Sequence, residues 1–156
     1  MRTEQIEPFI DAAVGMFRDL LGMESEHSSP YIVEENDEGD WDISGVIGIG
    51  GDTRGALAIS FSSEVAAELT GQLVGRSVLA DDPDVADAVG EMASIVAGNA
   101  KKGLERYRLT LTTPSIQRRA DRRLALPTET SIFGIPFLLP AGKIRLSVGL
   151  ESMTAL

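Results

Sequence analysis

The chain has 156 residues, of which 43% are hydrophobic and 24% are charged, and its formal net charge at pH 7 is −10. This length and composition predict one domain, residues 1–156, with a proper hydrophobic core. The acidic balance argues against general nucleic-acid binding, which depends on lysine and arginine neutralising phosphates. There is no cysteine, and His27 is the single histidine, which excludes disulfides and both thiolate and multi-histidine metal sites.

The first residues, MRTEQIEPFIDAAVGMFRDLLG, mix charges through their apolar positions and so lack the pattern of a signal peptide. No stretch of the sequence is long and apolar enough to predict a membrane span. We therefore expect a cytoplasmic protein with no membrane partner.

Apolar residues at helical spacing predict a first helix over Thr3–Leu21, with Gly22 as its C-terminal stop. Alternating and β-branched residues then predict three short strands, at Tyr31–Glu35, Asp42–Gly50 and Gly55–Phe61. The segment SSEVAAELTGQLVG predicts a second helix that is capped by Ser62 or Ser63 and ends at Gly75.

A long helix is predicted from Pro83 to about Arg106, followed by four segments with strand patterns, LTLTTPSIQ, RRLAL, SIFGIPFLLP and GKIRLSVGL. The order is helix, three strands, two helices, and then three or four strands. It predicts an α+β domain in which helices pack on a mostly antiparallel sheet. A helical segment is followed by sheet twice, which gives the order a rough twofold character.

The long helix holds the most informative pattern. At about 100° per residue, its polar residues lie within roughly 40° of one direction. They form a solvent-facing stripe of Asp87, Glu91, Ser94, Gly98, Lys101 and Glu105. The opposite face has the apolar spacing of a helix packed on a core, with Val85, Val89, Met92, Val96 and Ala100. Asp82 suits the N-cap and Pro83 the first helical position.

Two interpretations of this stripe are open. Glu91 and Ser94 are about 4.5 Å apart along the helix axis, so an acid and a hydroxyl could together bind a partner. Ordinary surface helices, however, have the same residue types at this spacing. Gly98 costs about 1 kcal/mol relative to alanine inside a helix. It therefore indicates either the close approach of another protein or a tight helix crossing within the fold. Asn99 lies about 140° from Ser94 and is expected to be structural.

Other motifs have plainer interpretations. The run GIGGDTRG at Gly48–Gly55 lies between strands and lacks a following Gly-Lys-Ser/Thr, which predicts a hairpin turn and not a phosphate loop. Glu24, Glu26 and His27 follow a helix end without a second histidine, so we expect a linker and not a metal site. Ser/His/Asp catalysis would need His27, and no G-x-S-x-G motif accompanies it.

The residues DAVGEMASIVAGNAKKG at Asp87–Gly103 resemble the signature helix of the CheC/CheX chemotaxis phosphatases, and CheX most closely. The family pattern is Asp or Ser, three residues, Glu, two residues, Asn. GALAISF before SSEVAAELTGQLVG is similar to the family's strand and following helix, and the residues Gly134–Phe137 with GKIRLSVGLE resemble its closing strands. The resemblance covers most of the chain and implies the family's pseudo-twofold α+β fold.

Members of that family hydrolyse the aspartyl phosphate of a response regulator such as CheY. The resemblance implies that the partner brings the magnesium and the phosphate, so that the chain needs no cofactor of its own. It also implies that the motif Glu, here Glu91, binds a lysine near the phosphate, while the motif Asn orients the attacking water. Asp87 matches the leading position, but Ser94 stands in the place of the Asn. A serine hydroxyl is shorter than a carboxamide and cannot present a fixed acceptor together with a fixed NH2 donor.

The leading hypothesis is a CheX-like domain that docks onto a phosphorylated CheY-like receiver domain. Glu91 and Ser94 are the catalytic candidates, hydrolysis is weakened by Ser94, and the predicted docking residues are Asp87, Glu91, Ser94, Gly98 and Lys101. The alternative is a non-catalytic scaffold or adaptor in motility or signalling, which includes a homodimer paired through its sheets. The basic residues Arg118, Arg119, Arg122 and Arg123 fit either a guard against strand-edge aggregation or a surface for an acidic partner.

Overall fold

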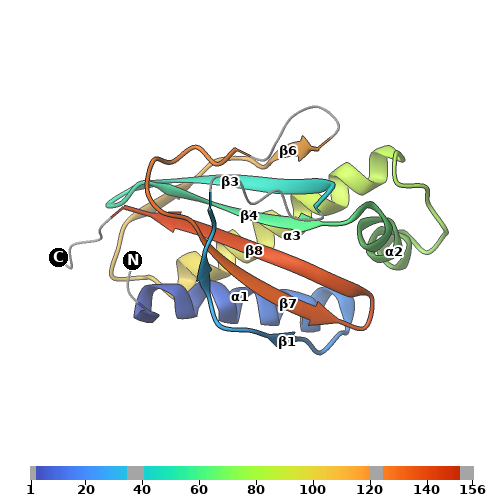
Figure 1. The fold of residues 1–156 in the computed structure, drawn as a ribbon, viewed down its shortest axis with the longest axis horizontal. Helices are drawn as coiled ribbons and strands as arrows, with labels where there is room; N and C mark the ends of the chain where they lie inside the picture. Colours follow the sequence, from blue (N-terminus) through green and yellow to red (C-terminus); the bar gives the residue numbers. More distant parts are fainter. Residues whose placement is uncertain (1–2, 35–40, 120–124, 152–156) are drawn as a thin grey trace.

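The computed structural model describes residues 3–34, 41–119 and 125–151 (Figure 1). Its helices are α1 (Thr3–Leu21), α2 (Ser63–Val74) and α3 (Pro83–Lys102). Its strands are β1 (Glu26–His27), β2 (Tyr31–Ile32), β3 (Ile43–Gly51), β4 (Gly55–Phe61), β5 (Leu109–Leu111), β6 (Ser115–Arg118), β7 (Phe133–Leu139) and β8 (Gly142–Leu150). None of the helices in the described residues is long and apolar enough to cross a membrane.

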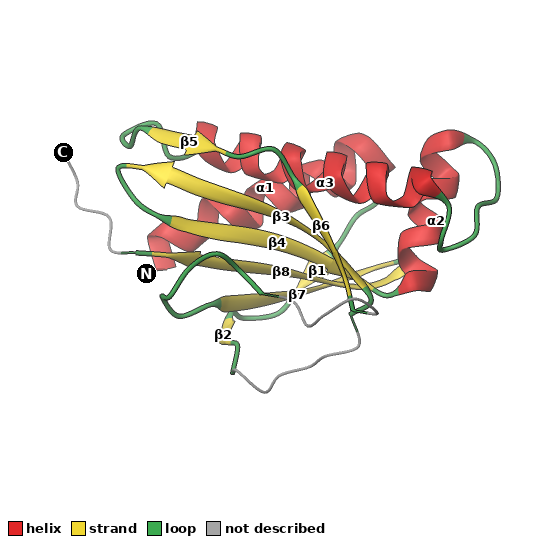
Figure 2. Ribbon diagram, turned by 90° about the horizontal axis from the view of Figure 1, so that it is seen from above, coloured by secondary structure: helices red, strands yellow, loops and turns green. Residues whose placement is uncertain are grey.

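The strands form one sheet in the order β1-β7-β8-β4-β3-β5, with β2 also paired to β7 and β6 to β3. Every strand pair in the described part of the chain is antiparallel. Figure 2 shows the helices on one face of this sheet. The predicted α+β architecture is confirmed.

The connections have the predicted twofold character. Helix α1 precedes the hairpin β3–β4, and α3 precedes the hairpin β7–β8. The two hairpins meet at β4 and β8, where Ala58 lies opposite Ser147. The short strands β1 and β2, which follow α1, pair with β7 of the second hairpin. The short strands β5 and β6, which follow α3, pair with β3 of the first hairpin. Each half of the chain therefore contributes a long helix and a hairpin to a shared core.

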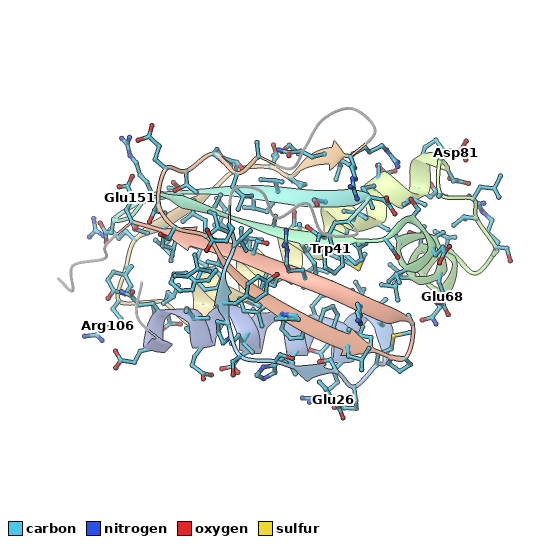
Figure 3. The ribbon with its side chains drawn as sticks, viewed as in Figure 1. Glu26, Trp41, Glu68, Asp81, Arg106 and Glu151 are labelled. Atoms are coloured by element: carbon cyan, nitrogen blue, oxygen red, sulfur yellow. The ribbon has the colours of Figure 1, made fainter. Side chains whose placement is uncertain are left out.

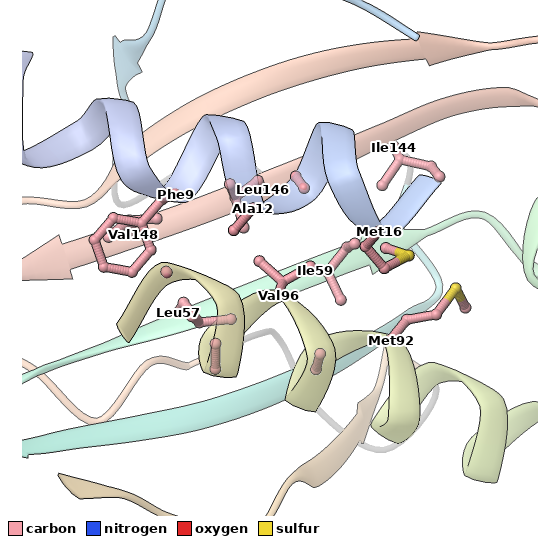
Figure 4. Close-up of a cluster of buried hydrophobic side chains, with 14 of the residues drawn as sticks. Phe9, Ala12, Met16, Leu57, Ile59, Met92, Val96, Ile144, Leu146 and Val148 are labelled. Atoms are coloured by element: carbon pink, nitrogen blue, oxygen red, sulfur yellow. The ribbon is translucent and has the colours of Figure 1, made fainter. Parts of the chain in front are cut away.

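The core lies between the helices and the sheet (Figure 4). Phe9 and Met16 of α1 are 1% exposed, and Met92 and Val96 of α3 are fully buried, as is Ile59 of β4. Apolar residues at i, i+3, i+4 and i+7 on α1 and α3 produce these faces because that spacing follows the helical period. Burial of such side chains from both helices fixes α3 against α1 and the sheet.

The middle of the opposite face of the sheet is also buried, and it carries a row of polar side chains. Ser44, Ser60 and Arg145 lie side by side across β3, β4 and β8, and the hydroxyls of Ser44 and Ser60 are 2.7 Å apart. Arg145 is 4% exposed. Its guanidinium donates to the Tyr31 hydroxyl at 3.3 Å and lies 5.6 Å from the ring centroid of Trp41, which Figure 3 labels. The side chains of Tyr31 and Trp41 therefore pack against Arg145 on this face.

Several strand predictions were wrong in extent. Only Tyr31 and Ile32 of the expected strand Tyr31–Glu35 are in β2, and Glu35 lies outside the described residues. The expected strand Asp42–Gly50 is β3, one residue later at each end. The predicted strand LTLTTPSIQ forms two strands, β5 and β6, which both pair with β3. Pro114 lies between β5 and β6 and interrupts the pairing, because proline has no backbone N–H to donate.

The segment RRLAL is not confirmed as a strand. Its first three residues lie outside the described part, and Ala125 and Leu126 are in no strand. The side-chain amide of Gln117 donates to the Ala125 carbonyl and accepts from the Ala125 N–H, both at 2.9 Å. This side chain therefore provides the hydrogen bonds that a neighbouring strand would otherwise supply.

Candidate functional site

The N-terminus of α3 is held by a small ionic cluster. Asp82 is the N-cap, as predicted, and its carboxylate accepts the Asp84 N–H at 2.9 Å. Arg76 pairs with Asp82 at 3.2 Å and with Asp84 at 2.6 Å. The hydrogen bond from the Asp84 backbone, followed by the bond from Arg76, lowers the pKa of Asp82. The helix therefore begins at a fixed point, and Arg76 is a positioning residue that the sequence patterns did not reveal.

A close contact with the sheet sets the position of α3 further along. A Cβ placed on Gly45 of β3 would lie 2.9 Å from the Val89 carbonyl oxygen and 3.0 Å from the Ala93 Cβ. Only glycine allows the helix backbone to come this near to the strand. The buried face of α3 is thereby locked onto β3, and the stripe on its other side is held in a fixed orientation.

Helix α3 ends at Lys102 and not near Arg106, so that prediction was wrong at its C-terminus. Gly103 packs so closely on α1 that a Cβ there would lie 3.0 Å from the Pro8 Cβ. Leu104 then enters the core at 5% exposure, and this turn carries the chain out of the helix. Glu105 therefore follows α3 and is not part of its stripe.

The other predicted site residues do share one helix face. Asp87, Glu91 and Lys101 are exposed, while Ser94 and Gly98 between them are half-buried. The predicted apolar face lies in the core, where Val85, Val89, Met92, Val96 and Ala100 are at most 1% exposed. The amphipathic prediction for this helix is confirmed, and the candidate site is a ridge of charged side chains around a lower, small-residue centre.

The charges of this ridge have no partners within the described part of the chain. The ion pairs found there join Arg18 to Glu24 and Arg76 to Asp82 and Asp84. Asp87 and Glu91 are therefore free to accept hydrogen bonds from a cation brought by another molecule. Among the described residues, no group of three or more His, Asp and Glu side chains is arranged to hold a metal ion. The ridge can bind and orient a group, but it offers no activated nucleophile.

The two helical glycines differ in their surroundings. A Cβ on Gly98 would meet nothing within 4 Å, so among the described residues there is no tight helix crossing at this point. A Cβ on Gly90 would touch Pro114 at 3.4 Å and Ile116 at 3.6 Å, which is ordinary packing. The described residues therefore give Gly98 no internal packing role, and the close approach of another protein stays a prediction. Asn99 is half-buried, at the boundary where it was expected.

The alternative motifs have structural roles. The GIGGDTRG run forms the β3–β4 hairpin, as predicted, and Gly51 takes a φ of +100° in the turn. The linker expected around Glu24, Glu26 and His27 was wrong in part, because Glu26–His27 is strand β1 and pairs with Leu138 and Phe137. Glu24 pairs with Arg18 at 3.1 Å. Backbone pairing to the β7 edge is a tertiary contact that the local pattern could not show.

A hollow of about 390 Å³ opens between α2 and the loop that leads to α3. Its lining consists of Ala67, Glu68, Gly71, Gln72, Arg76, Ser77 and Val78. No residue of the α3 ridge lines it. The hollow is thus separate from the candidate site, although Arg76, which lines it, also pairs with Asp82 and Asp84 at the start of α3.

The arrangement of helices on one face of an antiparallel sheet is shared with solved structures. The crystal structure of a CheC-like superfamily protein from Shewanella sp. PV-4 has a TM-score of 0.84 and 25% identity, and the match covers 97% of this chain and 100% of that chain. A chain in the crystal structure of the CheX–CheY–BeF3–Mg²⁺ complex from Borrelia burgdorferi has a TM-score of 0.81 and 25% identity, with coverage of 97% and 100%. The fold is that of the CheC-like chemotaxis proteins.

The sequence matches a narrower group within that class. The family described as chemotaxis phosphatase CheX matches residues 43–138, more than half of the chain. The CheY-P phosphatase CheX of Thermotoga maritima is 28% identical over 138 residues, which are 86% of this chain and 84% of that protein. The chain belongs to the CheX family.

Proposed function

We propose that this protein docks onto a phosphorylated CheY-type receiver domain through the exposed ridge of α3. The observation that carries the proposal is the pair of exposed carboxylates, Asp87 and Glu91, that have no ion-pair partner among the described residues and stand on the motif helix of a CheX-family chain. A relative is named CheY-P phosphatase CheX, and a structural neighbour is a complex with CheY, BeF3 and Mg²⁺. The proposal includes a cytoplasmic location.

In this complex Glu91 accepts hydrogen bonds from a lysine of the receiver domain. An exposed carboxylate on a fixed helix suits that role, because a charge-assisted hydrogen bond orients both partners. The magnesium ion and the phosphoryl group belong to the receiver domain. Hydrolysis requires a water oxygen to attack phosphorus while the bond to the aspartyl oxygen breaks, so the protein contributes position and electrostatics.

Ser94 limits the rate of this reaction. Its Oγ lies one bond from Cβ, whereas the polar atoms of asparagine lie two bonds away, a difference of roughly 1.3 Å in reach. A displacement of about 1 Å costs on the order of 100-fold in rate. Ser94 is half-buried on the helix surface beside the exposed Glu91, so its hydroxyl cannot make up the missing length. We expect docking with hydrolysis about 100-fold slower than with asparagine at this position.

The test is the decay of a phosphorylated CheY-type receiver domain, alone and with wild type, Glu91→Ala, Ser94→Asn and Glu7→Ala. Glu7 is the matched control because it is another exposed glutamate, on α1. We expect Ser94→Asn to accelerate decay about 100-fold over wild type, Glu91→Ala to remove any acceleration, and Glu7→Ala to behave as wild type. Binding is measured separately by calorimetry with the receiver domain loaded with BeF3⁻ and Mg²⁺.

The outcomes separate the candidate functions. Binding that Glu91→Ala weakens, without acceleration by wild type or Ser94→Asn, would replace the phosphatase proposal with the adaptor alternative. Absence of both binding and acceleration would contradict docking to this class of partner. A homodimer paired through the sheets remains a prediction, and sedimentation equilibrium of the wild type checks it.

A further inference from the structure

The loop between α2 and α3 presents an exposed leucine. Leu79 is 77% exposed, the highest fraction among the large hydrophobic side chains of the described residues. Val74, at the end of α2, is 42% exposed nearby in the chain. Figure 1 shows this loop standing out at one end of the molecule, away from the C-terminus.

This leucine stands on an ordered turn. The Asp82 N–H donates to the Leu79 carbonyl at 3.0 Å, which closes the turn just before α3. Asp82 and Asp84 are in turn bound by Arg76. A side chain whose backbone is already fixed loses less conformational entropy on binding than one on a loose loop.

The turn is close enough to the candidate site to be covered by the same partner. The hydrogen-bonded turn places the Leu79 and Asp82 Cα atoms within about 7 Å, and nine helical residues from Asp82 to Glu91 span about 13.5 Å. Leu79 and Glu91 are therefore at most roughly 20 Å apart. An interface of about 800 Å² per partner is roughly 32 Å across, so one docked domain is wide enough to contact both residues.

We propose that Leu79 is an apolar anchor of the receiver-domain interface, which extends from the Glu91 ridge across the N-terminus of α3 to the α2–α3 turn. This inference rests on the proposed function and adds a contact that lies outside the motif helix. The acidic ridge recognises a lysine, and Leu79 adds apolar contact with the surface beside it. An apolar contact combined with charged groups elsewhere in the same interface is typical of complexes in which charge orients the partner and buried apolar area holds it.

The experiment compares Leu79→Ser, Leu79→Met, Ile32→Ser and Glu91→Ala for binding to a CheY-type receiver domain loaded with BeF3⁻ and Mg²⁺. Ile32 is the matched control because it is an apolar side chain that is 55% exposed, on the edge strand β2. Burying a leucine side chain predicts Kd for Leu79→Ser weaker by about tenfold to a hundredfold. Leu79→Met and Ile32→Ser should stay within about twofold of wild type, and thermal melts should be unchanged because both sites are exposed.

Two results would overturn the inference in distinguishable ways. If Glu91→Ala weakens binding while Leu79→Ser binds as wild type, docking stands and Leu79 is outside the interface. If the wild type itself does not bind, the proposed function fails and the anchor fails with it. Equal weakening by Leu79→Ser and Ile32→Ser would indicate a general effect of lost surface apolarity and would also contradict a specific anchor.

Discussion

Replacing Gly98 with alanine is expected to stabilise the fold and to weaken docking. A Cβ at this position would meet nothing within 4 Å, so the added methyl group has room within the molecule. Alanine is favoured over glycine inside a helix by about 1 kcal/mol. For a chain of this size, that gain raises the melting temperature by roughly 2–4 °C.

The same methyl group faces the proposed partner. Gly98 has no side chain and lies between the half-buried Ser94 and the exposed Lys101, so a docked backbone can approach the helix most closely there. An extra methyl group in a closely packed contact costs about 1–3 kcal/mol, which corresponds to roughly 5- to 150-fold weaker binding. Stability and affinity are thus expected to change in opposite directions.

Differential scanning calorimetry and titration with the BeF3⁻-loaded receiver domain measure the two effects. Gly15→Ala is the control, because Gly15 lies within α1 and a Cβ there also meets nothing within 4 Å. It should raise the melting temperature equally and leave binding unchanged. If Gly98→Ala bound with wild-type affinity, the close approach of a partner at this position would be refuted. If its melting temperature fell, the conclusion that a Cβ at position 98 has room within the molecule would be refuted.

Three further predictions concern packing and charge within the fold. Gly45→Ala should lower the free energy of unfolding by about 1–3 kcal/mol in urea titrations, because its Cβ would lie 2.9 Å from the Val89 carbonyl oxygen; an unchanged value would mean that α3 shifts freely on β3. Ser147→Ala should leave stability unchanged or raise it by about 1 kcal/mol, since the buried Ser147 hydroxyl has no hydrogen-bond partner among the described residues; a marked loss would reveal a partner for that hydroxyl. Asp82→Asn keeps an N-cap but does not titrate. The Asp84 backbone N–H and Arg76 lower the pKa of Asp82, so its ionised form contributes stability above its unfolded pKa of about 4 and loses it as pH falls through the lower folded value. The urea midpoint of wild type should therefore fall relative to Asp82→Asn below about pH 4, and parallel pH profiles would contradict this assignment.

Local sequence patterns predicted most of the secondary structure. The limits of α1 and α2 and the start of α3 agree with the predictions, including the caps at Ser62, Gly75 and Asp82. Caps and amphipathic periodicity act between residues a few positions apart. The end of α3 was misplaced because Leu104 and Gly103 leave the helix to pack on the core and on Pro8, a contact with residues far away in the chain.

The candidate site was also predicted only in part. Helical geometry placed Asp87, Glu91, Ser94, Gly98 and Lys101 on one face, and the structure brings them together there. Glu105 was included wrongly, and Arg76 was missed. No local pattern marks Arg76 as the residue that binds two aspartates at the start of α3, because its partners are six and eight residues away across a loop.

The sequence by itself determined which residues can share a helix or strand face, and its resemblance to the CheC/CheX motif is what places Ser94 where the family pattern has asparagine. Only the tertiary structure decided which of those faces are covered. It buried Arg145 against Tyr31 and Trp41, and it left space around Gly98, where a Cβ would meet nothing within 4 Å. Periodicity depends on the local backbone, whereas exposure depends on which distant segments pack against a face, and this packing leaves the charged side chains of the α3 ridge exposed.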